Sequence, residues 1–130
     1  MKNNIETKKN FSIFKRAKSF AHAGRGIKIF FKTTHNAWIE LALFILAIFL
    51  AFYFNITVYE LLMLILVSGL VFVAEAFNTA IEIDMNLTSP EFHPFARDTK
   101  DVAAGAVLIS AITATVVGVV IFIPYILMLI

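Results

Sequence analysis

Three polar side chains interrupt a long apolar stretch of the sequence: Glu75, Asn78 and Glu82. Asn78 follows Glu75 by three residues and Glu82 follows it by seven, so an α-helix places all three on one face. Ionisable groups in a membrane-spanning helix are costly and usually face a bundle interior or a water-filled site. The stripe therefore predicts a catalytic or ion-binding site. Helix packing through Glu75 and Asn78, with Glu82 at the membrane surface, is the alternative.

A second polar group lies in the segment 84–101, which we expect to be a loop containing Glu91, His93, Lys100 and Asp101. Phosphoryl transfer needs oxygen ligands for Mg²⁺, a base for the acceptor hydroxyl and cations for the phosphate oxygens. The two groups together contain these residue types. An ion carrier or a multidrug exporter with an intramembrane carboxylate would use similar ones. Individually, Lys100 could anchor the interface, Asp101 could start the next helix and His93 could be solvated.

The composition predicts an integral membrane protein, since 60% of the 130 residues are hydrophobic and 15% are charged. We expect an all-α fold with a single domain, 1–130, and three transmembrane helices at 37–54, 59–83 and 102–130. Any active site must then be built from these helices and their loops. Three spans per chain favour a homo-oligomer. Cysteine is absent, which excludes disulfides and thiolate chemistry.

The basic residues predict the orientation in the membrane. Of the 11 Lys and Arg residues, two lie in the segment 84–101, namely Arg97 and Lys100, and the others all precede the first span. By the positive-inside rule, the N-terminus and the segment 84–101 are cytoplasmic and the C-terminus is outside. The first apolar run is long and no small-residue cleavage site follows it, so we interpret it as an uncleaved anchor in the cell membrane.

Residues 1–35 form the expected cytoplasmic and interfacial region. From Phe11 to Lys32, aromatic or apolar residues alternate with basic ones, which favours an amphipathic surface helix on anionic lipid. Gly24 and Gly26 are expected to break this helix in two. Basic residues among aromatics also occur in nucleic-acid-binding proteins, but the span that follows makes lipid the expected polyanion, and we exclude nucleic acid.

Three segments resemble the prokaryotic diacylglycerol kinase family. They are Glu-Ala-Phe-Asn-Thr-Ala-Ile-Glu at 75–82, Ser-Pro-Glu-Phe-His-Pro at 89–94, and Ala-Arg-Asp-Thr-Lys-Asp-Val-Ala-Ala-Gly-Ala-Val-Leu at 96–108. The resemblance covers 20–123, including Ala-Gly-Arg-Gly-Ile-Lys before the first span. The last two segments look most like the Gram-positive-type branch, which includes undecaprenol kinases.

The resemblance implies a homotrimer of three-span chains, each with an amphipathic surface helix. Such a protein transfers the γ-phosphate of MgATP to a lipid hydroxyl at the cytoplasmic face. Glu75 then matches the general base, Asn78 its polar partner, and Glu82 a carboxylate that binds the nucleotide-associated Mg²⁺. The sequence does not choose between undecaprenol and diacylglycerol, although the branch favours undecaprenol.

For the nucleotide, the resemblance implies four residues of the segment 84–101. Lys100 and Asp101 match the ATP-site pair, and Glu91 and His93 match loop residues close to the nucleotide. As an adjacent pair, Lys100 and Asp101 are more specific than either residue alone.

The sequence departs from the family pattern at three positions. Thr34 stands where a second metal-binding Glu is usual, Trp38 where a basic residue is common, and Asn86 replaces an Asp. One expectation is an active kinase with weakened Mg²⁺ binding, compensated by a group such as Glu40 or Asp84. The alternative is an impaired member that acts as a membrane scaffold or nucleotide-binding protein. A transporter is less expected, because the chain lacks repeated halves.

Overall fold

A computed structural model describes residues 13–129, with side chains from residue 16 onwards. This part of the chain contains four α-helices and no strand: α1 (Ile13–Thr33), α2 (His35–Tyr53), α3 (Val58–Thr88) and α4 (Pro94–Leu127). The all-α prediction is confirmed. Three of the helices, α2, α3 and α4, are long and apolar enough to cross a membrane.

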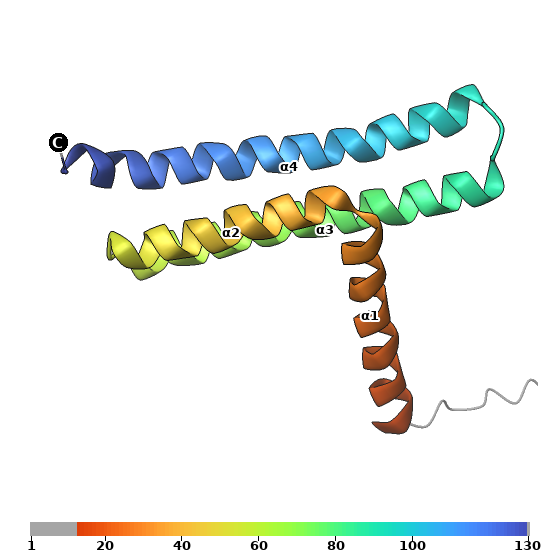
Figure 1. Cartoon of the computed structure of the whole chain (residues 1–130), viewed down its shortest axis with the longest axis horizontal. Coiled ribbons are helices and arrows are strands. Elements are labelled where there is room, and N and C mark those ends of the chain that lie inside the picture. Colours follow the sequence, from red (N-terminus) through yellow and green to blue (C-terminus); the bar gives the residue numbers. More distant parts are fainter. Residues whose placement is uncertain (1–12, 130) are drawn as a thin grey trace, which may run out of the picture.

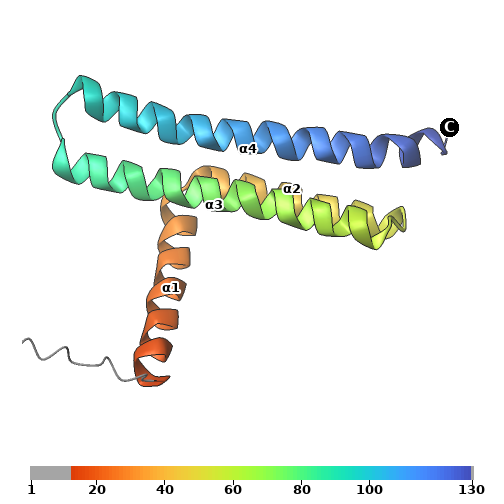
Figure 2. The ribbon, with the colours of Figure 1, turned by 180° about the vertical axis from the view of Figure 1, so that it is seen from behind.

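The three apolar helices lie side by side, and α1 leaves them at a steep angle (Figures 1 and 2). The central helix is α3, which packs against both α2 and α4. At 1.5 Å per residue, the 19 residues of α2 extend about 28 Å, while the 31 residues of α3 extend about 46 Å. The longer helices α3 and α4 therefore continue past the point where α1 begins to diverge (Figure 1).

The turn between α2 and α3 is specified locally. Asn55 adopts a left-handed conformation with φ of 53°, which Asn tolerates better than most residues. The amides of Asn55 and Ile56 then bond to the carbonyls of Phe52 and Ala51, which completes a Schellman motif at the end of α2. Asn55 therefore ends α2.

The start of α3 carries a capping box. The Thr57 hydroxyl accepts a hydrogen bond from the Glu60 amide, and the Glu60 carboxylate accepts one from the Thr57 amide. Nearby, Ala51, Leu64 and Ile121 form a small buried cluster that joins all three apolar helices. Most other large apolar side chains of the described residues point outward, as lipid-facing residues do.

Two expectations about the elements are wrong. The segment 84–101 is not a loop, because α3 continues to Thr88 and α4 begins at Pro94, so the connection is only 89–93. Hydropathy marks where a helix becomes polar, not where it ends. In addition, α1 is unbroken at Gly24 and Gly26, since glycine lowers helix propensity but adopts helical dihedral angles. Residues 11 and 12 of the expected surface helix lie outside the described part.

Candidate active site

The polar stripe of α3 lines a cavity at the junction of α1, α2 and α3. Glu75, Asn78 and Glu82 all face this cavity of about 480 Å³, which is closed on its other side by residues 33–36. Glu75 and Asn78 are 3% and 8% exposed, whereas Glu82 is exposed. The three side chains therefore share one face of α3, as predicted. The buried carboxylate, Glu75, lies towards the bundle, and the exposed one, Glu82, lies towards the polar end of α3.

Asn78 connects the stripe and also has an unused acceptor. Its side-chain amide donates a hydrogen bond to Glu82 Oε1 at 3.1 Å. The Asn78 Oδ1 atom is buried and has no hydrogen-bond partner in the described structure. A buried acceptor without a donor costs free energy, so this oxygen is available to a bound hydroxyl, water or cation.

Thr34 closes the cavity by a hydrogen bond to α3. The Thr79 hydroxyl donates to the backbone oxygen of Glu75 at 2.9 Å. A hydroxyl has one hydrogen, so in the 2.6 Å contact between Thr34 Oγ1 and Thr79 Oγ1, Thr34 is the donor. Thr34 thus holds the α1–α2 junction against α3. This is the position where the family resemblance predicts a second metal-binding Glu.

Two residues of α2 extend the polar group towards the membrane interior. The Asn36 side chain is a hydrogen-bonding neighbour of the Glu75 carboxyl group, and the Glu40 and Glu75 carboxyl groups interact electrostatically. Sequence reasoning considered Glu40 only as a compensating group and did not identify Asn36. Their spacing of four residues, which places them on one helix face, was the available signal.

The four expected nucleotide residues also lie together. Glu91, His93, Lys100 and Asp101 line a second cavity of about 290 Å³ around the α3–α4 connection. Lys100 and Asp101 lie on the second turn of α4, since this helix begins at Pro94. The alternative role of Asp101 as a charge at the start of the last helix is therefore wrong.

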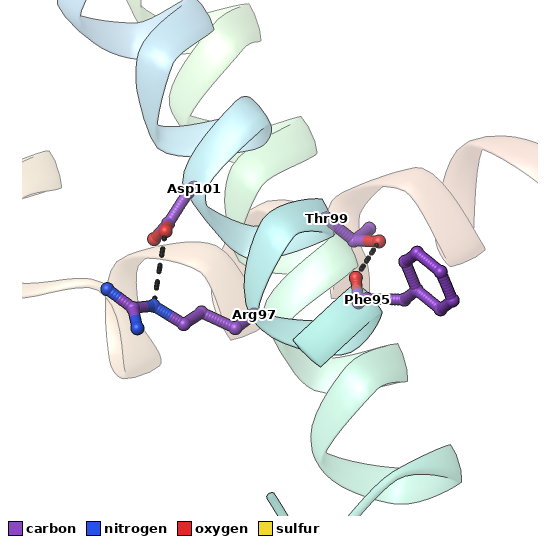
Figure 3. Close-up of polar contacts among 4 residues, drawn as sticks. All are labelled: Phe95, Arg97, Thr99 and Asp101. Atoms are coloured by element: carbon purple, nitrogen blue, oxygen red, sulfur yellow. Dashed lines mark hydrogen bonds and ion pairs between the residues drawn. The ribbon is translucent and has the colours of Figure 1, made fainter. Parts of the chain in front are cut away.

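Arg97 joins this cavity and was not among the expected site residues. Its Nε atom lies 3.6 Å from Asp101 Oδ2, and both side chains are exposed (Figure 3). In the same two turns of α4, the Thr99 hydroxyl donates a hydrogen bond to the Phe95 backbone oxygen (Figure 3). An exposed ion pair contributes little to stability, so Arg97 is free to turn towards an anion at small cost.

Asn86 connects the two cavities, since it lines both. Its Oδ1 atom accepts a hydrogen bond from Lys100 Nζ at 2.7 Å. The stripe and the expected nucleotide residues are up to 26 positions apart in the sequence (75 to 101), and Asn86 joins the two cavities that they line. Sequence reasoning noted Asn86 only as a departure from the family pattern.

The oxygen donors fit a Mg²⁺ ion that arrives with a nucleotide. The described residues contain no cluster of three or more His, Cys, Asp or Glu side chains suited to a metal. Mg²⁺ usually takes only one or two carboxylates and completes its coordination with waters and substrate phosphates. Glu82 and the free Asn78 oxygen supply such a partial set.

Comparisons with known proteins agree with this arrangement. A sequence model described as "Prokaryotic diacylglycerol kinase" matches residues 21–122. The chain is 36% identical to the undecaprenol kinase of Bacillus subtilis over 107 residues, which is 82% of this chain and 87% of that protein. It is 35% identical to a diacylglycerol kinase of Helicobacter pylori over 115 residues, covering 83% and 90% of the two chains. A diacylglycerol kinase of Synechocystis is 37% identical over 101 residues, 77% of this chain and 58% of that protein. The chain belongs to the prokaryotic diacylglycerol kinase family.

Proposed function

We propose that this multi-pass membrane lipid kinase transfers the γ-phosphate of MgATP to the hydroxyl of undecaprenol or diacylglycerol at the cytoplasmic face. The observation that supports the proposal is that two cavities with different linings meet at Asn86. One contains the buried carboxylate Glu75 beside the apolar bundle, and the other contains Lys100 and Arg97 beside the helix connection. Asn86 lines both, so a lipid hydroxyl and a nucleotide phosphate can meet between them.

In the proposed reaction, Glu75 removes the proton of the lipid hydroxyl while the hydroxyl oxygen attacks the γ-phosphorus. The new P–O bond forms as the bond to the β,γ-bridging oxygen breaks, and ADP leaves. Asn36 orients the Glu75 carboxylate, and Asn78 orients Glu82 through its amide. A general base of this kind contributes about 10²- to 10⁴-fold to a rate.

The nucleotide is held by the residues of the second cavity. Lys100 contacts phosphate oxygens as a compact cation, and Arg97 adds a planar fork that suits a phosphate. Asp101, Glu91 and His93 complete the nucleotide side of the site. When bound, Mg²⁺ would be held by Glu82 and would neutralise the charge that develops on the phosphate oxygens.

The helix lengths support the proposed level of the site in the membrane. The 19-residue α2 matches the hydrocarbon thickness of about 30 Å, so the α1–α2 junction lies at one surface. Thr34 at this junction bonds to Thr79, which puts Thr79 at the same level. Glu75 then lies one turn inside the membrane and Glu82 just outside it, where a lipid headgroup and a soluble nucleotide meet.

In the same proposal, α1 is an amphipathic helix on the cytoplasmic surface and three chains assemble into a trimer. Phe20, Ile27 and Phe31 recur on one face of α1, and basic residues such as Lys18 and Arg25 recur on the other. A helix of this kind lies in the plane of the interface on anionic lipid. In this proposal the N-terminus and the α3–α4 connection are cytoplasmic, which the positive-inside rule supports.

The test is transfer of ³²P from MgATP to undecaprenol and, separately, to diacylglycerol in mixed micelles. We expect labelled lipid with the unmodified protein, preferentially undecaprenol, and at least a hundredfold slower labelling with Glu75→Gln, on the order expected for a lost general base. Glu82→Gln should lose activity and recover part of it at high Mg²⁺. Absence of labelling with either lipid, from a folded protein, would refute the proposal and favour a non-catalytic, nucleotide-binding relative.

A further inference from the structure

The junction where α1 turns away from the bundle satisfies its hydrogen-bond acceptors but leaves donors open (Figure 1). Three carbonyl groups near the end of α1 each accept a hydrogen bond at 2.9 Å: Ile29 from the Thr33 hydroxyl, Phe30 from the Thr34 amide and Phe31 from the Trp38 indole N–H. In the described part of the chain, by contrast, no side chain caps the first turn of α2, since the hydroxyl of the N-cap residue Thr34 contacts Thr79 instead. The first amides of a helix have no partner within the helix, so those of α2 can bind an anion.

This first turn of α2 borders the cavity of the α3 stripe. Thr34, His35 and Asn36 line the cavity on the side opposite the stripe. Among all the residues that line it, His35 is the only one that can carry a positive charge, and its side chain is exposed. The N-terminus of a helix adds a partial positive charge of about half an elementary charge. The cavity therefore has two carboxylates on one wall and a positive region on the other.

An independent observation indicates that this cavity takes a ligand. Asn78 lines it and is 8% exposed, and the Asn78 Oδ1 atom has no hydrogen-bond partner in the described structure. A buried acceptor without a donor points to a polar occupant that brings a donor, such as the water shell of an ion. The uncapped amides require that the same occupant carry acceptor oxygens. A phosphate group with its ordered waters meets both requirements.

We propose that His35 and the uncapped amides of the first turn of α2 bind the γ-phosphate of the nucleotide. This assignment rests on the proposed function, in which the cations of the neighbouring cavity hold the rest of the phosphate chain. Because Asn86 lines both cavities, the terminal phosphate extends into the first while the others stay in the second. The positive region of α2 offsets the repulsion between this phosphate and the carboxylates Glu75 and Glu82. His35 is thus a substrate-binding residue, whereas Glu75 remains the base.

The binding test compares two nucleotides that differ in the γ-phosphate, MgADP and the non-hydrolysable MgAMP-PNP, on the purified protein in micelles. His35→Ala should weaken binding of MgAMP-PNP about tenfold, in line with a lost hydrogen bond to a charged group, and should leave the affinity for MgADP unchanged. His35→Pro should weaken MgAMP-PNP further, because proline suits the first position of a helix but also lacks the amide N–H. His22→Ala, the same replacement at an exposed position of α1, is the control.

A kinetic readout separates phosphate binding from a general structural effect. His35→Ala should lower kcat/KM for MgATP by about the same factor as the affinity for MgAMP-PNP, with the KM for the lipid unchanged. His35→Gln keeps a side-chain N–H group and should recover part of the loss. A purely structural role of the His35 ring would instead change the KM values for both substrates.

The outcomes are distinguishable. Equal losses of affinity for MgADP and MgAMP-PNP, or no loss for either, would overturn the assignment of His35 to the γ-phosphate. A loss confined to MgAMP-PNP, in a protein that phosphorylates neither lipid, would support the assignment and would refute the kinase reaction instead. Failure of the unmodified protein to bind either nucleotide would refute both.

Discussion

Lys100 donates a hydrogen bond to Asn86, with 2.7 Å between Nζ and Oδ1, and this contact links the second turn of α4 to the last turns of α3. The two residues flank the connection at 89–93. Because Asn86 also lines the cavity of the α3 stripe, the bond positions Lys100, the proposed phosphate-binding cation, relative to Glu75 and Glu82. The amide does this without neutralising the lysine, whose charge would stay available to the proposed nucleotide.

The first prediction follows from this contact. Asn86→Ala should raise the KM for MgATP several-fold, because Lys100 loses the acceptor that orients it, whereas the KM for the lipid should change little. Asn86→Asp keeps an acceptor but adds a charge that competes with phosphate for Lys100, so its KM for MgATP should also rise, and more at low than at high ionic strength. Initial rates over a range of MgATP concentrations check both variants.

If Asn86→Ala bound MgATP as tightly as the unmodified protein while Lys100→Met lost activity, Lys100 would not depend on Asn86 for its orientation. Asn86 would then serve only to hold α3 and α4 together.

The part of the site that could be predicted from sequence is the part set by local periodicity and motif. Glu75, Asn78 and Glu82 share a face because α-helical spacing requires it, and the same cavity contains all three. Lys100 and Asp101 are adjacent in the chain, so one cavity contains both. The shared helix face and the adjacency in the chain do not depend on how the helices pack.

What could not be predicted depends on contacts between helices. The electrostatic interaction between Glu40 and Glu75 joins two helices and follows from how α2 packs on α3. The hydrogen bond from Thr34 to Thr79 spans 45 positions and ties a helix junction to α3. Hydropathy does not predict the extension of α3 to Thr88, because a helix can continue through polar residues beyond the membrane.

The second prediction concerns Thr34. Thr34→Glu should lower the Mg²⁺ concentration needed for half-maximal activity, because it adds a carboxylate to the cavity that contains Glu75 and Glu82. Thr34→Val, which loses the hydrogen bond to Thr79 without adding charge, is the matched control and should not share this gain. Titration of the rate with Mg²⁺ at constant free ATP is the measurement. An unchanged Mg²⁺ requirement in Thr34→Glu would show that position 34 does not reach the metal.

The third prediction uses the single tryptophan of the chain. Trp38 Nε1 donates to the Phe31 backbone oxygen at 2.9 Å, and its ring centroid lies 5.3 Å from that of Phe31. These contacts hold the start of α2 against the end of α1, which the proposed orientation puts at the membrane surface. Trp38 fluorescence should therefore be quenched most by lipids brominated near the headgroup. Strongest quenching by lipids brominated near the chain ends would place the α1–α2 junction, and the site with it, inside the bilayer.

The fourth prediction concerns the opposite end of the bundle. The Glu60 carboxylate, which already caps α3 through Thr57, accepts a hydrogen bond from the Tyr125 hydroxyl at 2.8 Å and so attaches the end of α4 to the α2–α3 turn. The Tyr125 ring also lies 6.0 Å from that of Phe54, between centroids. Tyr125→Phe keeps the ring and loses the hydrogen bond, so it should lower the unfolding temperature in micelles.

A double-mutant cycle tests whether Glu60 and Tyr125 stabilise the protein through their hydrogen bond or independently of each other. Glu60→Gln should lower the unfolding temperature further than Tyr125→Phe, since it also weakens the capping box, and the double variant should lose less than the sum of the two. Because both residues lie far from the polar cavities, the KM values for lipid and MgATP should stay unchanged at temperatures where the variants are folded. Additive losses would mean that the two side chains do not stabilise each other, and altered KM values would mean that the end of α4 is coupled to the site through the length of the helix.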